Sequence, residues 1–228
     1  MKVLGVTCAR GGSKRIPRKN VRELAGKPLI AWTIQEALKS QYLDNYIVST
    51  DDNEIAKISI QYGAVVLERP EELAQDNTPS ILALQHAVKA MEEKHGRFDI
   101  IADIRCTNPT KTVEDIDAMI ELLQYTQGEN VIGVGLAYPV ERIKRIDKQG
   151  RIKDIIHEPL DGQSQFLKES WVRNGSCYVM YRDVLMEEDI LFGNRESYAY
   201  QMPKERSVNI DDEVDWLLAE VLLAAKTE

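Results

Sequence analysis

The sequence predicts an α/β protein, a three-layer sandwich on a mainly parallel, Rossmann-like sheet, with an inserted β-rich arm. A chain of 228 residues is long enough to bury one full α/β core, and it fits a single domain over residues 1–228 better than two separate domains. Short apolar runs rich in β-forming residues alternate with amphipathic stretches of helical period, as in βαβ units. Helix start signals fall between these runs, so two independent patterns indicate the same fold class.

The first predicted elements follow this alternation along the chain. Strands are expected at residues 2–8, 46–50, 64–67, 100–105 and 131–136. A helix is expected over residues 28–38, because apolar residues from Ile30 to Leu38 recur there at helical spacing. These helices are expected to cover the sheet.

Three helix starts are predicted from capping patterns, in which a short polar side chain accepts hydrogen bonds from the first turn. They are Thr112 with Asp115 three residues later, Thr78 before Pro79, and Asp51 with Glu54. Gly63 is expected to end the helix that Asp51 begins.

The alternation of predicted strands and helices stops after residue 136. Two alternating runs, 142–146 and 151–156, flank a polar turn and predict a β-hairpin. Residues 138–172 are therefore expected to form an arm inserted into the domain. Beyond it, strands are expected at residues 176–181 and 207–210, and a closing helix at residues 214–226.

Composition and charge exclude several classes of protein. The net charge of −8 argues against a nucleic-acid partner, which requires a basic face. No apolar run is long enough to cross a bilayer and no signal peptide is recognisable, so we expect a cytoplasmic protein without a membrane partner. Cys8, Cys106 and Cys177 lack CxxC spacing and are expected to be buried, reduced thiols.

The basic residues are concentrated at the amino terminus. Residues 1–22 hold seven basic residues and no acid, so the remainder carries −15. Residues 9–20, which follow the first predicted strand, combine glycines with cations. Such a loop turns its backbone N–H groups onto phosphate oxygens and offsets their charge, which predicts a triphosphate site. The spacing matches neither a Walker A loop nor the GxGxxG fingerprint, and a solvated basic turn is the alternative.

Four blocks of sequence resemble one family. They are the basic loop, residues 68–80, residues 173–178 and residues 208–216, and they occur in the order of the CMP-sialic acid synthetases, or acylneuraminate cytidylyltransferases, including the legionaminic and pseudaminic acid enzymes. The resemblance implies a cytidylyltransferase that joins CTP to an acidic 3-deoxy-2-ulosonic sugar and releases pyrophosphate. It also implies a homodimer formed through the arm.

The resemblance implies site residues by position. By this resemblance, the residues expected to bind the nucleotide are Arg10, Gly11, Gly12, Ser13, Lys19, Asn20, Arg69 and Ser80. The residues expected to take part in catalysis are Arg10, Lys19 and Asp211. Sugar binding is carried over to Arg105, Thr107, Gln165 and Asn174. For Asn174 a turn with Gly175 explains the sequence equally well.

Asp211 matches the metal-binding aspartate of the resembled family. Nucleotidyl transfer needs Mg²⁺ to offset charge on the α-phosphate and the leaving pyrophosphate, and Mg²⁺ binds one or two carboxylates together with phosphates and water. Asp211 or Asp212 also stands where an N-cap of the final helix is expected.

Two positions depart from the family pattern. Asn209 replaces an aspartate two residues before Asp211, and Arg105 replaces a glutamine. Arg105 is expected either to bind an acidic group of the substrate or to pair with Asp103 or another carboxylate. A nucleotidyltransferase for another sugar or base, and a nucleotide-binding homologue with impaired catalysis, therefore stay open as alternatives.

Overall fold

The computed structural model describes residues 1–157, 167–193 and 196–225. Within them the chain forms a seven-stranded sheet, in the order β11-β7-β10-β6-β1-β4-β5. Its strands are β1 (Val3–Cys8), β4 (Asn45–Thr50), β5 (Val65–Glu68), β6 (Ile100–Ile104), β7 (Asn130–Ala137), β10 (Ser170–Tyr181) and β11 (Ser197–Met202). Neighbouring strands are parallel except that β10 runs antiparallel to β6 and β7. The predicted mainly parallel α/β sheet is confirmed.

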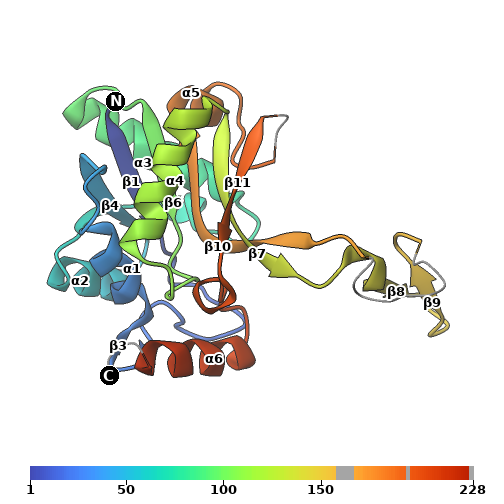
Figure 1. Ribbon diagram of the computed structural model, residues 1–228. Coiled ribbons are helices and arrows are strands. Elements are labelled where there is room, and N and C mark those ends of the chain that lie inside the picture. Colours follow the sequence, from blue (N-terminus) through green and yellow to red (C-terminus); the bar gives the residue numbers. More distant parts are fainter. Residues whose placement is uncertain (158–166, 194–195, 226–228) are drawn as a thin grey trace.

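Helices cover both faces of the sheet and complete the three layers (Figure 1). They are α1 (Leu29–Ala37), α2 (Asn53–Gln61), α3 (Ser80–His95), α4 (Val113–Thr126), α5 (Arg182–Met186) and α6 (Glu213–Ala224). The central strands β1 and β6 are buried almost throughout, as expected for strands covered on both faces. Because both faces of these strands are buried, their sequences are nearly continuous runs of apolar residues.

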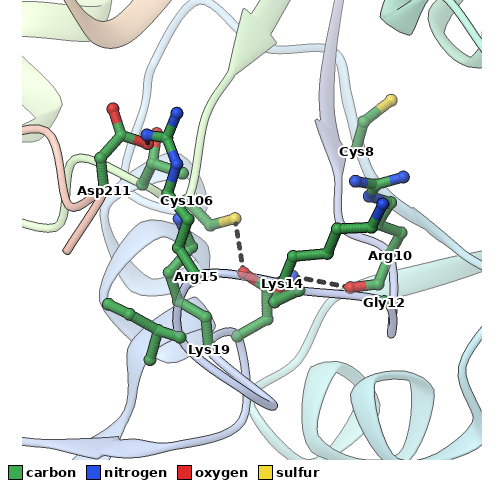
Figure 2. A pocket seen from close by; sticks show the side chains of 12 residues that line it. Cys8, Arg10, Gly12, Lys14, Arg15, Lys19, Cys106 and Asp211 are labelled. Atoms are coloured by element: carbon green, nitrogen blue, oxygen red, sulfur yellow. Dashed lines mark hydrogen bonds and ion pairs between the residues drawn. The ribbon is translucent and has the colours of Figure 1, made fainter. Parts of the chain in front are cut away.

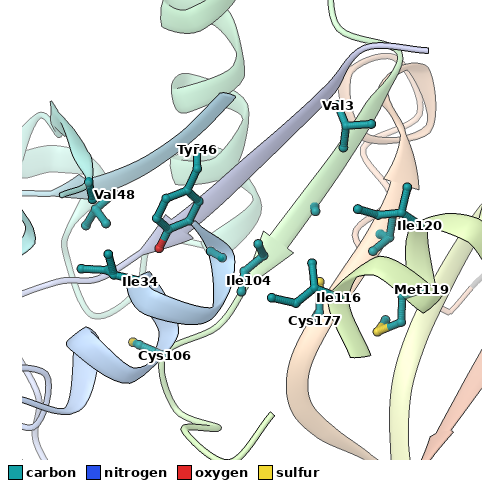
Figure 3. Close-up of a cluster of buried hydrophobic side chains, with 14 of the residues drawn as sticks. Val3, Ile34, Tyr46, Val48, Ile104, Cys106, Ile116, Met119, Ile120 and Cys177 are labelled. Atoms are coloured by element: carbon teal, nitrogen blue, oxygen red, sulfur yellow. The ribbon is translucent and has the colours of Figure 1, made fainter. Parts of the chain in front are cut away.

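The side chains of each strand alternate between two apolar clusters. On one face, Ile34 of α1 and Ile116 of α4 pack on Val48 and Ile104 (Figure 3). On the other face, α3 and α5 pack on side chains that include Leu4, Val6, Ile101 and Met180. Because the strand period is two, successive residues serve opposite clusters.

A third apolar cluster lies beneath the basic loop. It joins Ile16 of that loop to Trp216 of α6 and to Val208 and Ile210. The prediction of a strand at residues 207–210 is wrong, since this extended segment belongs to no sheet. Its apolar residues alternate because they pack on α6, and Ile210 N–H donates to Thr107 O at 2.8 Å.

The strand that the sequence reading missed is β11, at the edge of the sheet beside β7. The remaining short elements are β2 (Glu23–Leu24) paired with β3 (Lys27–Pro28), and the 3₁₀ turns Glu71–Leu73, Val140–Arg142 and Lys204–Arg206.

Three helix starts can be compared with the capping predictions. The box between Thr112 and Asp115 begins α4 as predicted. The N-cap of α2 is Asp52 and not Asp51, because the Asp52 carboxylate accepts from the first-turn amides. Thr78 does not cap α3; its hydroxyl donates to Glu72 O, and the N-cap position is Pro79.

The arm projects far from the body of the molecule (Figure 1). The ends of β7 and β10 lead into it, and β8 (Lys144–Ile146) pairs with β9 (Ile152–Asp154) as the predicted hairpin. Tyr138, Ile146 and Ile152 are 82%, 74% and 69% exposed on it. Among the described residues, none of the helices combines the length and apolar character that crossing a membrane requires.

We expect Asp212→Ala to lower the free energy of unfolding by about 1 kcal/mol, the usual cost of losing an N-cap. The Asp212 carboxylate accepts from Val214 N–H and Asp215 N–H at 2.9 and 3.0 Å. Urea denaturation measures the change, and Asp211→Ala is the matched control because Asp211 caps nothing. Equal destabilisation by both variants would contradict the assignment of Asp212 as the N-cap of α6.

Candidate active site

A cavity of about 360 Å³ opens over the basic loop at the carboxyl end of β1. In open α/β sheets this edge is where ligands bind. The loop supplies Arg10, Gly12, Ser13, Lys14, Arg15, Ile16, Lys19 and Asn20, and the opposite wall is formed by Cys106, Thr107 and Asp211 (Figure 2). The structure therefore brings Arg10, Gly12, Ser13, Lys19, Asn20, Thr107 and Asp211 together around one cavity.

Internal hydrogen bonds fix the shape of the loop. The Asn20 amide donates to Arg10 O at 3.0 Å and accepts from the Cys106 thiol at 3.2 Å. Lys19 Nζ donates to Ile210 O at 2.7 Å, which ties the loop to the segment before Asp211. The loop is thus held in place by its own side chains.

Gly11 lies where a side chain cannot fit. Its N–H donates to Asp51 Oδ1 at 3.2 Å, and a Cβ atom there would lie 2.5 Å from Asp52 Oδ2. Gly12, by contrast, faces open space. Of the two glycines, only Gly11 is required by close packing against a neighbour.

Carboxylates balance part of the loop's positive charge. Asp76 lies 3.1 Å from Arg10 and 2.6 Å from Lys14, and Asp211 lies 3.4 Å from Arg15. Lys14 and then Arg10 hold the pKa of Asp76 below its usual range. Because exposed ion pairs contribute little, a triphosphate with several negative charges can displace these carboxylates.

A second, more enclosed cavity of about 270 Å³ adjoins the first and shares Arg10 and Cys8 with it. Arg69 and Ser80 both line it, together with Thr78 and Asp76. Arg69 is buried and donates to Ser49 O at 2.6 Å and to Ser49 Oγ at 3.2 Å. Arg69 and Ser80, two of the residues assigned to the nucleotide by resemblance, therefore share one cavity with Arg10.

A third cavity, of about 420 Å³, is lined by residues of β10 and of the loop that follows β6, and it contains two arginines. Arg105 lies over the ring of Tyr178 at 5.5 Å, and Arg173 lies over Phe192 at 3.7 Å. Arg105 also pairs with Asp103, but at the long distance of 3.5 Å. Most guanidinium donors of Arg105 remain available to the second and third cavities, both of which it lines.

Asp211 lines both the first and the third cavity. Its Oδ2 accepts from Asn209 Nδ2 at 3.0 Å, and its carboxylate takes no part in capping α6, since the Asp212 carboxylate does so. Within the described ranges there is no group of three or more His, Cys, Asp or Glu residues that could hold a metal. A single carboxylate beside a phosphate site nevertheless fits Mg²⁺, which takes most of its ligands from phosphates and water.

Comparison with known proteins identifies the family. Residues 5–170 match the family described as Cytidylyltransferase. The chain belongs to the cytidylyltransferase family. Its members are nucleotidyltransferase enzymes, so the resemblance read from the sequence is confirmed.

Three curated relatives illustrate the similarity. The cytidylyltransferase is 32% identical to CMP-N,N'-diacetyllegionaminic acid synthase of Legionella pneumophila, covering 100% of this chain and 99% of that one. It is 29% identical to pseudaminic acid cytidylyltransferase of Campylobacter jejuni, again covering 100% of this chain and 99% of that one. It is 34% identical to N-acylneuraminate cytidylyltransferase A of Danio rerio, with 93% of this chain covered but 48% of that protein. The chain thus spans about half the length of the zebrafish relative.

Two solved structures have the same fold. One is CMP:2-keto-3-deoxy-manno-octonic acid synthetase complexed with CTP, with a TM-score of 0.74 at 15% identity, covering 99% of this chain and 100% of that one. The other is 4-diphosphocytidyl-2C-methyl-D-erythritol synthase from Anaerococcus prevotii, with a TM-score of 0.66 at 12% identity, covering 97% and 98%.

One predicted sugar-binding residue, Asn174, does not line the cavities described above. Asn174 is 2% exposed, and its amide donates to Met202 Sδ and Ser207 Oγ while accepting from Ser176. The structure therefore favours the structural role over contact with a sugar, and a β-bulge in β10 follows at this point. Gln165 lies outside the described residues.

The sequence reading missed several cavity residues. Arg173 was quoted within a family block without a role, and Tyr178 stood inside the predicted strand at residues 176–181. Asp76 stood inside the block of residues 68–80 without a role, and Phe192 belongs to a loop segment without periodicity, so no sequence signal marked it. Their importance arises from loops that meet at the edge of the sheet.

The cysteines of the cytidylyltransferase form no disulfide. Cys106 and Cys177 are buried as predicted, whereas Cys8 is only partly buried and borders two cavities. Burial raises the pKa of the Cys8 thiol to about 12 and also raises the pKa of Cys106. All three therefore carry no charge near neutral pH and do not compete with phosphate for the cations.

We expect Gly11→Ala to weaken CTP binding and to lower the free energy of unfolding by about 1 kcal/mol. The new Cβ displaces Asp52, which is fixed as the N-cap of α2 and by Arg18. Gly12→Ala is the steric control and should unfold at the wild-type denaturant concentration. Calorimetric titration and urea denaturation measure both effects, and identical behaviour of the two variants would refute the packing argument.

Proposed function

We propose that this enzyme transfers CMP from CTP to an acidic 3-deoxy-2-ulosonic sugar of the sialic, legionaminic or pseudaminic acid type, and releases pyrophosphate. The observation that carries the proposal is the meeting of three cavities around shared residues. Arg10 belongs to the first and second cavities, Arg105 to the second and third, and Asp211 to the first and third. The named activities of the Legionella and Campylobacter relatives support the same substrates.

The nucleotide occupies the first two cavities in this proposal. Its triphosphate lies on the basic loop, where Arg10 and Lys19 offset the negative charge and Gly12 and Ser13 line the cavity. The nucleoside lies in the enclosed second cavity between Arg69 and Ser80. Asn20 contributes by holding the loop through Arg10 O.

The sugar occupies the third cavity. Arg105 and Arg173 provide fixed cations for its carboxylate, and Arg–carboxylate pairs are strong when two N–H donors are used. Tyr178 and Phe192 provide apolar faces for substituents of the ring. Thr107, which borders both the first and the third cavity, lies where the two substrates meet.

The reaction is an in-line attack by the anomeric hydroxyl of the sugar on the α-phosphorus, with pyrophosphate leaving. Positioning and electrostatic stabilisation contribute most of the rate in such transfers. Asp211 would hold Mg²⁺, which when bound offsets charge on the α-phosphate and the leaving group. Arg15 must release Asp211 for this role, and a triphosphate offers Arg15 a stronger anionic partner.

The arm supports a homodimer. Its described part exposes Tyr138, Ile143, Ile146, Ile152 and Trp171 far from the body of the molecule. Exposed apolar groups on one projecting element are favourable for burial against a second copy of the chain. The absence of disulfides among the three thiols and the use of CTP both favour a cytoplasmic location.

Asn209 favours a second candidate function, a nucleotide-binding homologue with impaired catalysis. Its amide donates to Asp211 where a carboxylate would add a second metal ligand. Arg105 likewise leaves open a nucleotidyltransferase for a different sugar or base. Each of these alternatives predicts its own result in an assay of pyrophosphate release.

The test is pyrophosphate release by the purified protein with Mg²⁺, using each of the four ribonucleoside triphosphates against sialic, legionaminic, pseudaminic and 2-keto-3-deoxy-manno-octonic acids. We expect release only with CTP and one of the first three acids. Release with another nucleotide or only with the last acid would favour the alternative enzyme. CTP binding without release from any sugar would favour the impaired homologue.

We expect Asp211→Asn to lower kcat by at least about a hundredfold, because loss of a metal ligand exceeds the tenfold to hundredfold effect of outer-shell changes. The fold should persist, since Asp212 caps α6. Mg²⁺ titration of the CTP complex should show weaker metal binding. Near-normal turnover and metal affinity would remove Asp211 from the mechanism.

We expect the double variant Ile146→Lys, Ile152→Lys to shift the protein from dimer to monomer, because buried unpaired lysines are costly at an interface. Light scattering after size exclusion measures the mass. The control is Ile60→Lys, an exposed apolar residue of α2 on the body of the molecule. A dimer of unchanged stability would exclude this part of the arm from the interface.

A further inference from the structure

Lys111 is a buried lysine behind the loop that follows β6. It is 2% exposed, and its Nζ donates to Thr33 Oγ1 at 2.7 Å, to Arg105 O at 2.7 Å and to Asn108 O at 2.6 Å. All three acceptors are uncharged, and no salt bridge to a carboxylate is present in the part of the chain that the structure describes. The ammonium group is therefore fully hydrogen-bonded but lacks an ion-pair partner.

The bonds of Lys111 close the loop into a tight turn. Arg105 O and Asn108 O lie at its two ends, so the ammonium fixes the intervening Cys106 and Thr107. Those two side chains form the wall of the first cavity opposite the basic loop. The bond to Thr33 anchors the same turn on α1.

Asn108 extends this network to the other walls of the site. Its Oδ1 accepts from Lys111 N–H at 3.0 Å, and its Nδ2 donates to Asn174 O at 3.2 Å and to Arg206 O at 3.0 Å. Thr107 O accepts from Ile210 N–H at 2.8 Å, directly before Asp211. The turn that Lys111 holds thus connects β10 and the segment carrying Asp211.

The charge of Lys111 is balanced only at a distance. The titratable groups that face it are Glu36 of α1, Asp103 of β6, which pairs with Arg105, Asp115 of α4, Cys106 of the loop and Cys177 of β10. Asp115 already pairs with Arg206 at 3.0 Å, and Glu36 with Lys39. Burial raises the pKa of both thiols, so neither supplies a negative charge near neutral pH.

We propose that Lys111 is a positioning residue for the nucleotidyl transfer: its ammonium holds the Arg105–Asn108 turn against the substrates, and its buried charge favours the polyanionic nucleotide. The inference rests on the proposed function, because it requires CTP in the first cavity. Lys111 touches neither substrate. It acts by holding Arg105 and Thr107 in position, and its positive charge behind the cavity wall attracts the negatively charged nucleotide.

The role makes binding depend on pH in a specific direction. Burial lowers the pKa of Lys111 to about 8. When the proton is lost, the amine retains two N–H donors for three acceptors, and the positive charge disappears. CTP affinity therefore falls as the pH rises from 7 to 9.

The stability of the unliganded protein changes in the opposite direction. The unfolded chain holds the Lys111 proton up to a pKa near 10.5, whereas the folded chain releases it near 8. Between these values the unfolded state binds more protons, so this residue's contribution to stability rises with pH. A lysine with a purely structural role would produce the stability trend without the fall in CTP affinity.

The experiment is calorimetric titration of CTP with Mg²⁺ at pH 7, 8 and 9, on wild-type protein, Lys111→Arg and Lys111→Met. Lys57→Met, at an exposed position of α2, is the matched control. We expect the wild-type Kd to rise at least about fivefold across this range, a typical coupling between two sites. Lys111→Arg keeps a charge and donors at every pH, so its Kd should stay constant.

Lys111→Met should bind CTP at least about tenfold more weakly at pH 7, as expected when a charge-assisted network is lost. Lys57→Met should follow the wild-type profile. A pH-independent wild-type Kd, or a Lys111→Arg profile that matches wild type, would overturn the inference. If Lys111→Met does not fold, the comparison of wild type with Lys111→Arg decides alone. Absence of CTP binding by wild-type protein would instead overturn the proposed function, and this inference with it.

Discussion

The accumulation of positive charge on one loop is the constraint on which the rest of the site depends. Residues 9–20 must hold several cations close together, and mutual repulsion opposes this arrangement in the absence of a ligand. The structure meets the constraint with short internal bonds from Lys19 and Asn20, and with carboxylates from distant segments, Asp76 and Asp211. These carboxylates lie where an anionic substrate competes with them, so substrate binding can replace ion pairs that stabilise the loop.

The same loop is useful only if the opposite wall is equally rigid. That wall comes from the turn after β6, from β10 and from the segment before α6, which are far apart in sequence. Asn108 and Lys111 join them through bonds to backbone carbonyls. The antiparallel β10 is central here, since it inserts between β6 and β7 and also leads into the arm. One strand therefore links the sugar cavity to the surface proposed for dimerisation.

Much of the fold was predictable because the signals are local. The central strands, the helices around Ile34 and Ile116, the capping box of Thr112 and the hairpin of the arm all follow from periodicity or spacing. The errors occurred where two local patterns compete. Residues 207–210 alternate like a strand but pack on α6, and β11 pairs at an edge with little periodic burial. Asp51 and Asp52 offer equivalent caps, and only the course of the chain selects Asp52.

The sequence by itself determined the family, the basic glycine loop and the position of Asp211, because these depend on residue types at short, fixed spacings. The tertiary structure decided which roles those residues can take. Asp212 caps α6 and leaves Asp211 available, Asn174 is enclosed by polar neighbours, and Arg105 lies between Asp103 and two cavities. It also buried Lys111, which has no carboxylate partner among the described residues. Burial and long-range pairing arise from how distant segments meet, and no local pattern encodes that meeting.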